Sequence, residues 1–192
     1  GGRLMIDADE DEDENETDAF MARDECVLDT VVVQSETGAF EIFTYEAGRH
    51  SDGTICSMRA LLPIHSTTQP ESASACASIQ WRLCTLTEIT RACAGPAGLS
   101  YPYGRQLIEG QCNIRDAYVQ SGDTESSVAP SGHFAACVSE EGIFDLTGNV
   151  WEWVAVSDRN FVYFGAGHRI IAQRHRDEDH SCNSFVTLPP AV

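Results

Sequence analysis

The residues with the most distinctive chemistry in this sequence are its eight cysteines. They lie between residues 26 and 182, and none forms a C-x-x-C pair. Zinc sites and redox motifs cluster their cysteines, whereas scattered cysteines in even number are typical of a disulfide framework. We therefore expect disulfides and an oxidising compartment: the extracellular space, the cell surface or the periplasm. Buried free thiols in a cytosolic protein are the alternative, and the pairing cannot be read from the sequence.

Two further segments carry groups that could bind metals or take part in catalysis. In FDLTGNVWEW, residues 144–153, two of the three tryptophans of the chain flank Glu152. In HRDEDH, residues 175–180, the side chains of His175, Asp177, Asp179 and His180 could hold a transition metal. A solvated charged loop is the commoner explanation of such a run. No G-x-S-x-G motif or nucleophile with a paired base stands out.

The elements that must position these groups are short. The segments 27–33 and 39–47 are rich in Val, Ile, Phe and Tyr and predict strands, as do 160–164, 168–173 and 184–188. Small apolar residues at helical spacing predict a helix over 71–80. A second helix is expected over 85–95, with Thr85 as N-cap, Glu88 three residues on and Gly95 past its end. Residues 48–68 and 96–142 read as long loops. The pattern is α+β, loop-rich, with short strands and few helices.

The charge of the chain is strongly acidic, with a formal net charge of −18. Nine of the acids lie within residues 7–18, so residues 1–24 are expected to form a flexible acidic tail before a single domain over 25–192. Nucleic acid is excluded as a partner, because phosphate contacts need a basic face. No apolar run approaches the length of a membrane span.

Several segments, in order, resemble one family. These are FEIFTYEA (40–47), RLCTLTEITRAC (82–93), YPYG (101–104), CN (112–113) and GIFDLTGNVWEW (142–153). They are similar to the motifs of the formylglycine-generating enzymes, also called sulfatase-modifying factors, and the resemblance covers about residues 26–185. It implies a variant of the C-type lectin fold, poor in regular secondary structure.

The resemblance also implies calcium sites. The first would use the carboxylates of Asp145 and Glu152 and the backbone carbonyls of Gly148 and Val150, with Trp151 and Trp153 directed into the core. Clustered oxygens of this kind suit a hard cation; a plain buried strand is the alternative. The second site would begin at Asn113 and Ile114 and include Asp123, although a turn in a polar loop explains these residues as well.

The chemistry of the family, however, is not matched. Its copper ion is held by two cysteines after the Trp-rich motif, near a G-G-S segment. Here FGAGHRIIAQRHR occupies residues 164–176, and no cysteine lies between Cys137 and Cys182. The resemblance thus implies a binding or structural module without this activity, which recognises a protein or glycan or packs in a surface assembly.

The segment 157–180 departs most from the family, and we expect its aromatic and basic side chains to contact the ligand. The candidates are Tyr163, Phe164, His168, Arg169, Arg174, His175 and Arg176. The alternative function is a metal-dependent oxidoreductase with a divergent site, in which Cys182 would be the reactive thiol.

Overall fold

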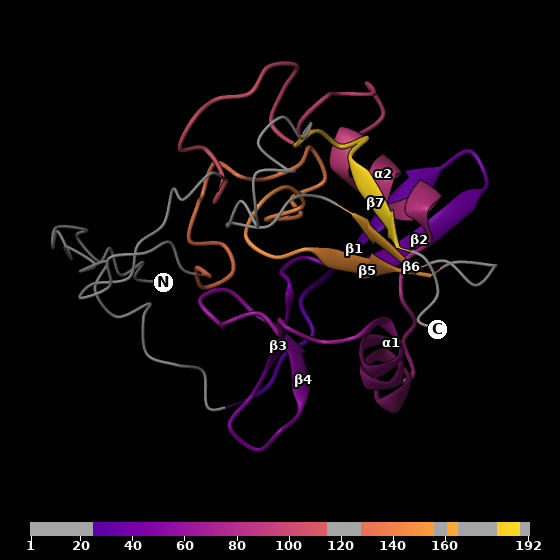
Figure 1. The fold of residues 1–192 in the computed structure, drawn as a ribbon, viewed down its shortest axis with the longest axis vertical. Helices are drawn as coiled ribbons and strands as arrows, with labels where there is room; N and C mark the ends of the chain where they lie inside the picture. The colour runs from indigo at the N-terminus through magenta and orange to yellow at the C-terminus, as the bar shows by residue number, and fades with distance from the viewer. Residues whose placement is uncertain (1–24, 115–127, 156–160, 165–179, 189–192) are drawn as a thin grey trace, which may run out of the picture.

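The computed structural model describes residues 25–114, 128–155, 161–164 and 180–188. These ranges contain two helices and seven short strands joined by long loops, so the predicted α+β class is confirmed. In Figure 1 the sheet β5–β6–β7 lies near the centre, α2 and the hairpin β1–β2 lie to one side, and α1 and the hairpin β3–β4 lie below it. The elements in chain order are β1 (Thr30–Ser35), β2 (Gly38–Phe43), β3 (Ala47–Arg49), β4 (Ile55–Ser57), α1 (Gln69–Ser78), α2 (Leu86–Ala94), β5 (Glu152–Val154), β6 (Phe161–Phe164) and β7 (Phe185–Leu188).

The first hairpin, β1–β2, confirms the strands expected over 27–33 and 39–47, with shifted ends. Its antiparallel register pairs Ser35 with Gly38, so only two residues form the turn. Gly38 has a φ of +126°, a conformation that glycine adopts without steric cost. Alternation along the strands directs Val33 and Ile42 into the core.

The second hairpin, β3–β4, corrects the expectation of an unbroken loop over 48–68. Three residue pairs join its strands, and Gly48 lies opposite Cys56. All three residues of β4 are buried. Strands of three residues in a Gly- and Ser-rich segment leave too short a pattern to recognise from sequence.

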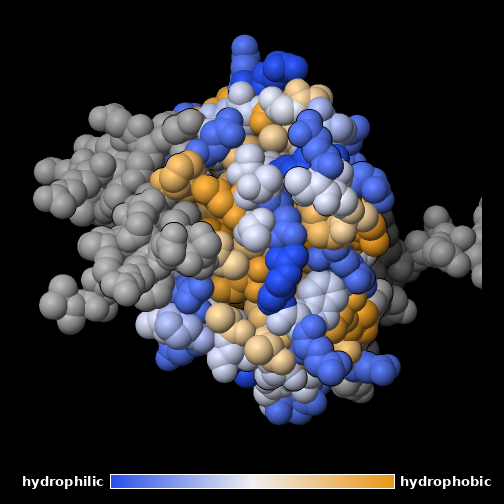
Figure 2. Space-filling view, turned by 90° about the vertical axis from the view of Figure 1, so that its right-hand side faces the viewer, coloured by the Kyte–Doolittle hydropathy of each residue, from blue (hydrophilic) through white to orange (hydrophobic). Residues whose placement is uncertain are grey.

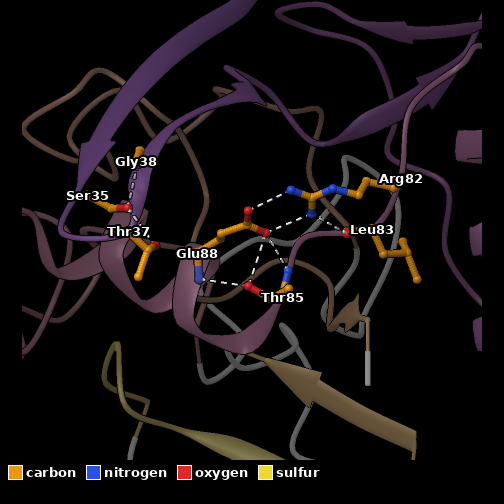
Figure 3. Close-up of polar contacts among 7 residues, drawn as sticks. All are labelled: Ser35, Thr37, Gly38, Arg82, Leu83, Thr85 and Glu88. Carbon is orange, nitrogen blue, oxygen red and sulfur yellow. Dashed lines mark hydrogen bonds and ion pairs between the residues drawn. The ribbon is translucent and has the colours of Figure 1, made fainter. Parts of the chain in front are cut away.

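Both helices begin at a capping box. The prediction for α2 is confirmed: Thr85 is the N-cap, Glu88 closes the box, and Gly95 caps the C-terminus with a φ of +61°. Figure 3 shows Glu88 accepting hydrogen bonds from Thr85 and from Arg82 together. The helix α1 begins two residues earlier than expected, because Thr68 and Glu71 form its capping box.

The core lies where the β1–β2 hairpin, α2 and the sheet β5–β6–β7 meet. β6 is the central strand of this antiparallel sheet. The backbone N–H of Ala155, just after β5, donates to Cys84 O at 2.8 Å and so joins the sheet to the start of α2. The principal core residues are Val33, Ile42, Ile89, Ala92, Cys93, Ala94, Ile143, Leu146, Val154, Phe164 and Cys182.

Three disulfides link distant segments, as the scattered cysteines predicted. They join Cys26 to Cys56, Cys93 to Cys182 and Cys112 to Cys137. The framework is incomplete, because Cys76 and Cys84 are free thiols. Structural disulfides of this number indicate an oxidising compartment. Neither helix in the described ranges has the length and apolar character needed to cross a membrane.

Candidate functional site

Three buried carboxyl groups interact electrostatically in and near the Trp-rich segment. Two of them, Asp145 and Glu152, were expected from the sequence as metal ligands. The third, Glu46, lies just before β3 and is only 6% exposed. Its Oε2 accepts hydrogen bonds from Ser131 Oγ at 2.9 Å and from Asn149 Nδ2 at 2.7 Å. Glu46 was not among the site residues expected from the sequence, although it lies within the segment 40–47 that resembles the family.

Burial raises the pKa of all three carboxyl groups. The pKa of Glu46 lies well above its usual value, first because the group is buried and then because Asp145 and Glu152 repel its charge. Burial also raises the pKa of Asp145 to about 6, although the Gly132 N–H donates to its Oδ2. The pKa of Glu152 is raised to about 8 by burial and by the charge of Asp145. Ionised carboxylates repel one another in a buried site, so these groups are stabilised either by a bound cation or by protonation.

Two carboxylate oxygens in this cluster lack a hydrogen-bond partner. They are Oε1 of Glu46 and Oε2 of Glu152, and both atoms are buried. Glu152 as a residue is half-buried, but this oxygen is enclosed. A buried acceptor without a donor costs about 1–3 kcal/mol, and more when it is charged. A bound cation would remove that cost.

The backbone around Gly148 is shaped by its closeness to Asn113. Gly148 has a φ of +89°, and a Cβ there would lie 2.6 Å from Asn113 O. The next residue, Asn149, donates its backbone N–H to Asn113 O at 2.9 Å and accepts from Asn113 Nδ2 at 2.9 Å. The structure thus brings Asn113 and Ile114 beside the first expected calcium set. Asp123 lies outside the described residues, so the second set stays a prediction.

The first set fits a calcium ion in its chemistry. Its donors are all oxygens, and one carboxylate oxygen, Glu152 Oε2, is orphaned. Among the described residues, no hydrogen bond uses the carbonyls of Gly148 or Val150. In the same ranges, no three His, Cys, Asp or Glu side chains lie close enough to hold a metal by themselves. The backbone carbonyls would therefore have to complete the coordination.

A groove of about 1040 Å³ opens above the cluster. Glu46 and Glu152 both line it, while β2, α1 and residues 80–84 supply much of its walls. All three tryptophans of the chain, Trp81, Trp151 and Trp153, belong to the lining. The expectation that Trp151 and Trp153 fill the core is therefore wrong, because both are half-buried and line the groove.

Specific contacts hold the groove walls in place. Phe43 of β2 packs against Trp81 with ring centroids 4.7 Å apart. Trp153 Nε1 donates to Thr67 O at 2.9 Å, which ties β5 to the segment before α1. On the face in Figure 2, hydrophobic residues lie on both sides of a strip of hydrophilic ones rather than in one patch. Hydrophobic and hydrophilic residues thus alternate across the coloured part of this face.

Comparison with known proteins identifies the scaffold. The sequence profile of the sulfatase-modifying factor enzyme 1-like domain matches residues 29–181. The chain belongs to this family. Among solved structures, it is similar to PvdO from Pseudomonas aeruginosa, with a TM-score of 0.54, 13% sequence identity and coverage of 80% of this chain and 76% of that chain. At this identity the likeness shows the fold alone. No curated protein matches the sequence.

Within this sulfatase-modifying-factor scaffold, the residues expected to contact a ligand are mostly not described. His168, Arg169, Arg174, His175 and Arg176 lie outside the described residues, and only the backbone of Tyr163 is placed, in β6. Phe164 is placed differently from expectation, because it is fully buried in the core and has no surface to offer a ligand.

The histidine that ends the HRDEDH run is also placed. His180 is 6% exposed, so a solvated loop does not describe it. Its backbone carbonyl accepts a hydrogen bond from Thr147 Oγ1, one residue before Gly148. His175, Asp177 and Asp179 lie outside the described residues, and a metal site there stays untested.

Two thiols remain near the groove. Cys84 lines it, and burial raises the pKa of this thiol to about 12. The pKa of Cys76, in α1, is also raised by burial. Both groups therefore stay protonated at neutral pH, and a protonated thiol is a weak nucleophile and metal ligand.

Proposed function

We propose that this protein is a non-catalytic binding module on the sulfatase-modifying-factor scaffold, stabilised by calcium. The observation that carries the proposal is the state of Cys182. It is the one cysteine after the Trp-rich segment, and it is bonded to Cys93. The copper chemistry that the family resemblance implied needs two thiolates in that part of the chain. The chain retains the scaffold without that pair.

The calcium part of the proposal rests on the buried carboxylates. Asp145 and Glu152, with the carbonyls of Gly148 and Val150, would hold the ion. When bound, the ion supplies positive charge beside Asp145, whose pKa is raised by burial, and beside Glu152, whose pKa is raised by burial and by the charge of Asp145. Its role in this proposal is to fix the loop over 145–152, which forms one wall of the groove.

The groove is the proposed ligand site; ligand contacts by the aromatic and basic residues expected in the segment 157–180, other than the buried Phe164, stay a prediction. A cleft with aromatic walls and a few polar groups is the usual form of a binding site. The partner would be a protein or a glycan, and packing against other copies in a surface assembly uses the same kind of surface. The disulfides support export to the cell surface, the extracellular space or the periplasm.

Calcium-dependent unfolding tests this function. Thermal unfolding would be followed in excess calcium, in magnesium and in chelator, for the unaltered protein and for Glu152→Gln. A ligand at about 100 times its Kd stabilises the folded state by about 2.7 kcal/mol. We expect calcium alone to raise the Tm, and the variant to lose most of that rise. Equal Tm values in calcium and chelator would refute the calcium part.

One observation favours a second function, that of a metal-dependent oxidoreductase with a divergent site. The free thiol of Cys84 borders a groove large enough for a substrate. Its raised pKa counts against thiolate chemistry. Titration with copper(I) would decide between the two functions, because tight binding that Cys84→Ser abolishes would establish a soft-metal site.

A further inference from the structure

The strand β2 has one unpaired edge. Among the described residues, only β1 pairs with it. Ser35 and Gly38 face each other across a two-residue turn, so they form a hydrogen-bonded pair, and such pairs alternate along an antiparallel ladder. The backbone N–H and C=O groups of Ala39, Glu41 and Phe43 therefore point away from β1. In the described part of the chain, no hydrogen bond uses these backbone groups.

The groove runs along this edge. Every residue from Ala39 to Phe43 lines it, whereas no residue of β1 does. Neighbouring side chains of a strand point to opposite faces of a sheet, so a cavity against one face would be lined by alternate residues of both strands. Lining by consecutive residues of one strand places the groove beside its edge. The unpaired backbone groups thus face a groove of about 1040 Å³.

The edge of β2 lacks most of the features that prevent strand pairing. Its register with β1 is continuous over six pairs, so no bulge interrupts it, and the strand contains neither proline nor lysine. An edge without such features accepts a strand from another chain, which then binds through main-chain hydrogen bonds. The one charged residue of β2 is Glu41, which is exposed.

The charge of the rim selects the partner. Glu41 and Glu71 line the groove, are exposed and form no ion pair within the described ranges. Hydrogen bonds from the backbone and side chain of Thr68 hold the pKa of Glu71 below its usual value, so it is ionised at neutral pH. The two arginines of the lining, Arg49 and Arg82, are bonded within the protein. A second copy, with a formal net charge of −18, is repelled, and a basic partner is attracted.

We propose that the groove binds an extended, basic segment of a partner protein, which adds to the unpaired edge of β2 as a further strand. This inference rests on the proposed function and names the class of its ligand. The main chain of the segment pairs with Ala39, Glu41 and Phe43. The side chain opposite Glu41 is an arginine or a lysine, because opposite charges stabilise a cross-strand pair. The side chain opposite Phe43 is apolar, since Phe43 packs against Trp81.

A methylated peptide series tests the main-chain pairing. The probe is the capped peptide Thr-Val-Thr-Arg-Thr-Val-Thr, added to the protein in calcium and followed by fluorescence, because all three tryptophans of the chain line the groove. With the arginine opposite Glu41, the N–H groups of the arginine and the valines face β2, and those of the two inner threonines face away. Methylating the first set should weaken binding at least about tenfold, and methylating the second less than about threefold.

Proline variants assign the edge of the protein. Glu41→Pro removes an N–H that faces the groove and keeps the hydrogen bonds between β1 and β2. The matched control is Val32→Pro, because Val32 lies opposite Glu41 and its N–H faces the other edge of the hairpin. We expect Glu41→Pro to weaken peptide binding at least about tenfold and Val32→Pro to change it less than about twofold.

Amide hydrogen exchange of the unaltered protein gives the same information where a proline variant does not fold. Bound peptide should slow exchange at Ala39, Glu41 and Phe43, whose N–H groups gain a partner. Exchange at Phe40 and Ile42 should change little, because their N–H groups already donate to β1 in this register.

Other outcomes overturn the inference. Equal affinities of the two methylated forms would show attraction to charge without main-chain pairing. Equal losses in the two proline variants, or exchange that does not slow at Ala39, Glu41 and Phe43, would place the peptide elsewhere. Equal binding of a peptide with glutamate in place of arginine would contradict the selection by charge. If no peptide binds while calcium still raises the Tm, the strand-addition inference fails and the calcium-stabilised scaffold stands. If the peptide binds and calcium has no effect, the inference stands and the calcium part of the proposed function fails.

Discussion

Cys93 of α2 is covalently bonded to Cys182, 89 residues later in the chain, and both side chains are fully buried in the core. The bond joins the second helix to the segment that leads into β7. It also removes from thiol chemistry the one cysteine that follows the Trp-rich segment. The Cys93–Cys182 disulfide thus stabilises the scaffold. It also leaves no free thiol at Cys182 for the copper chemistry that the family resemblance implied.

Removing this bond should have a large effect on stability. The double variant Cys93→Ser/Cys182→Ser should lower the free energy of unfolding by about 4 kcal/mol, because the bond closes a long loop in the unfolded chain. Urea unfolding followed by tryptophan fluorescence measures this difference. Cys76→Ser, which replaces a free and only half-buried thiol, should change it by less than about 1 kcal/mol. Similar losses in both variants would contradict the assigned pairing.

The close approach of Gly148 to Asn113 predicts a sensitive position. Gly148→Ala should destabilise the fold by about 3 kcal/mol, since a Cβ meets backbone at 2.6 Å and the φ of +89° strains an alanine. Gly38→Ala is the matched control, because it has a positive φ of +126° but no atom within 4 Å of the added Cβ. It should cost about 1 kcal/mol. Equal unfolding energies for the two variants would show that the contact with Asn113 has no energetic weight.

In calcium-free buffer, the buried carboxyl groups should make stability fall as the pH rises. The pKa of Glu152 is about 8 in the folded protein against an ordinary 4.5, so the folded state binds more protons than the unfolded state between these values. The contribution is fully present below pH 4.5 and is lost as the pH passes 8. Tm values in chelator across this range measure it.

The matched variants isolate this pH effect. Glu152→Gln should reduce the slope of the Tm profile, and the slope that remains comes from Glu46 and Asp145. Glu41→Gln removes an exposed acid of the same groove and should not reduce it in this way. Saturating calcium should weaken the slope in the unaltered protein, because a bound cation favours the ionised carboxylates. An identical profile for Glu152→Gln and the unaltered protein would argue against a buried, proton-binding Glu152.

The cysteine assignments can be checked by alkylation and mass. Without reductant, the native protein should take up label at Cys76 and Cys84 alone, and after reduction and unfolding at all eight cysteines. Cys84 should react more slowly than Cys76, because its pKa is raised to about 12 and thiolate is the reactive form. Peptide mapping locates the labels. A native protein that takes up no label would show a fourth disulfide instead.

The parts of the fold that the sequence predicted are those set by neighbouring residues. The helix α2 was predictable because Thr85, Glu88 and Gly95 mark its ends within a few residues. The hairpin β3–β4 was missed, since its strands are three residues long and their burial depends on distant packing. The free state of Cys76 and Cys84 was likewise not predictable, because a disulfide depends on which cysteines the tertiary fold brings together.

The residues of the site, too, were predictable where the signal is local in the sequence, and were missed where it depends on the tertiary fold. Asp145 and Glu152 were found because they lie within one distinctive segment. Glu46 joins them from about 100 residues earlier in the chain, as its hydrogen bond with Asn149 shows. The groove was not foreseen either, because its walls come from β2, α1, residues 80–84 and the Trp-rich segment. Only the folded chain places these segments side by side.

The metal content of the protein tests the central claim most directly. The purified protein would be dialysed against calcium together with copper, with ascorbate as a reductant that leaves the disulfides intact, freed of loosely bound ions by gel filtration, and analysed for both metals. The account predicts bound calcium, lost in the double variant Asp145→Asn/Glu152→Gln, and no stoichiometric copper. One tightly bound copper per chain, with no calcium, would contradict a non-catalytic, calcium-stabilised module and point to an oxidoreductase.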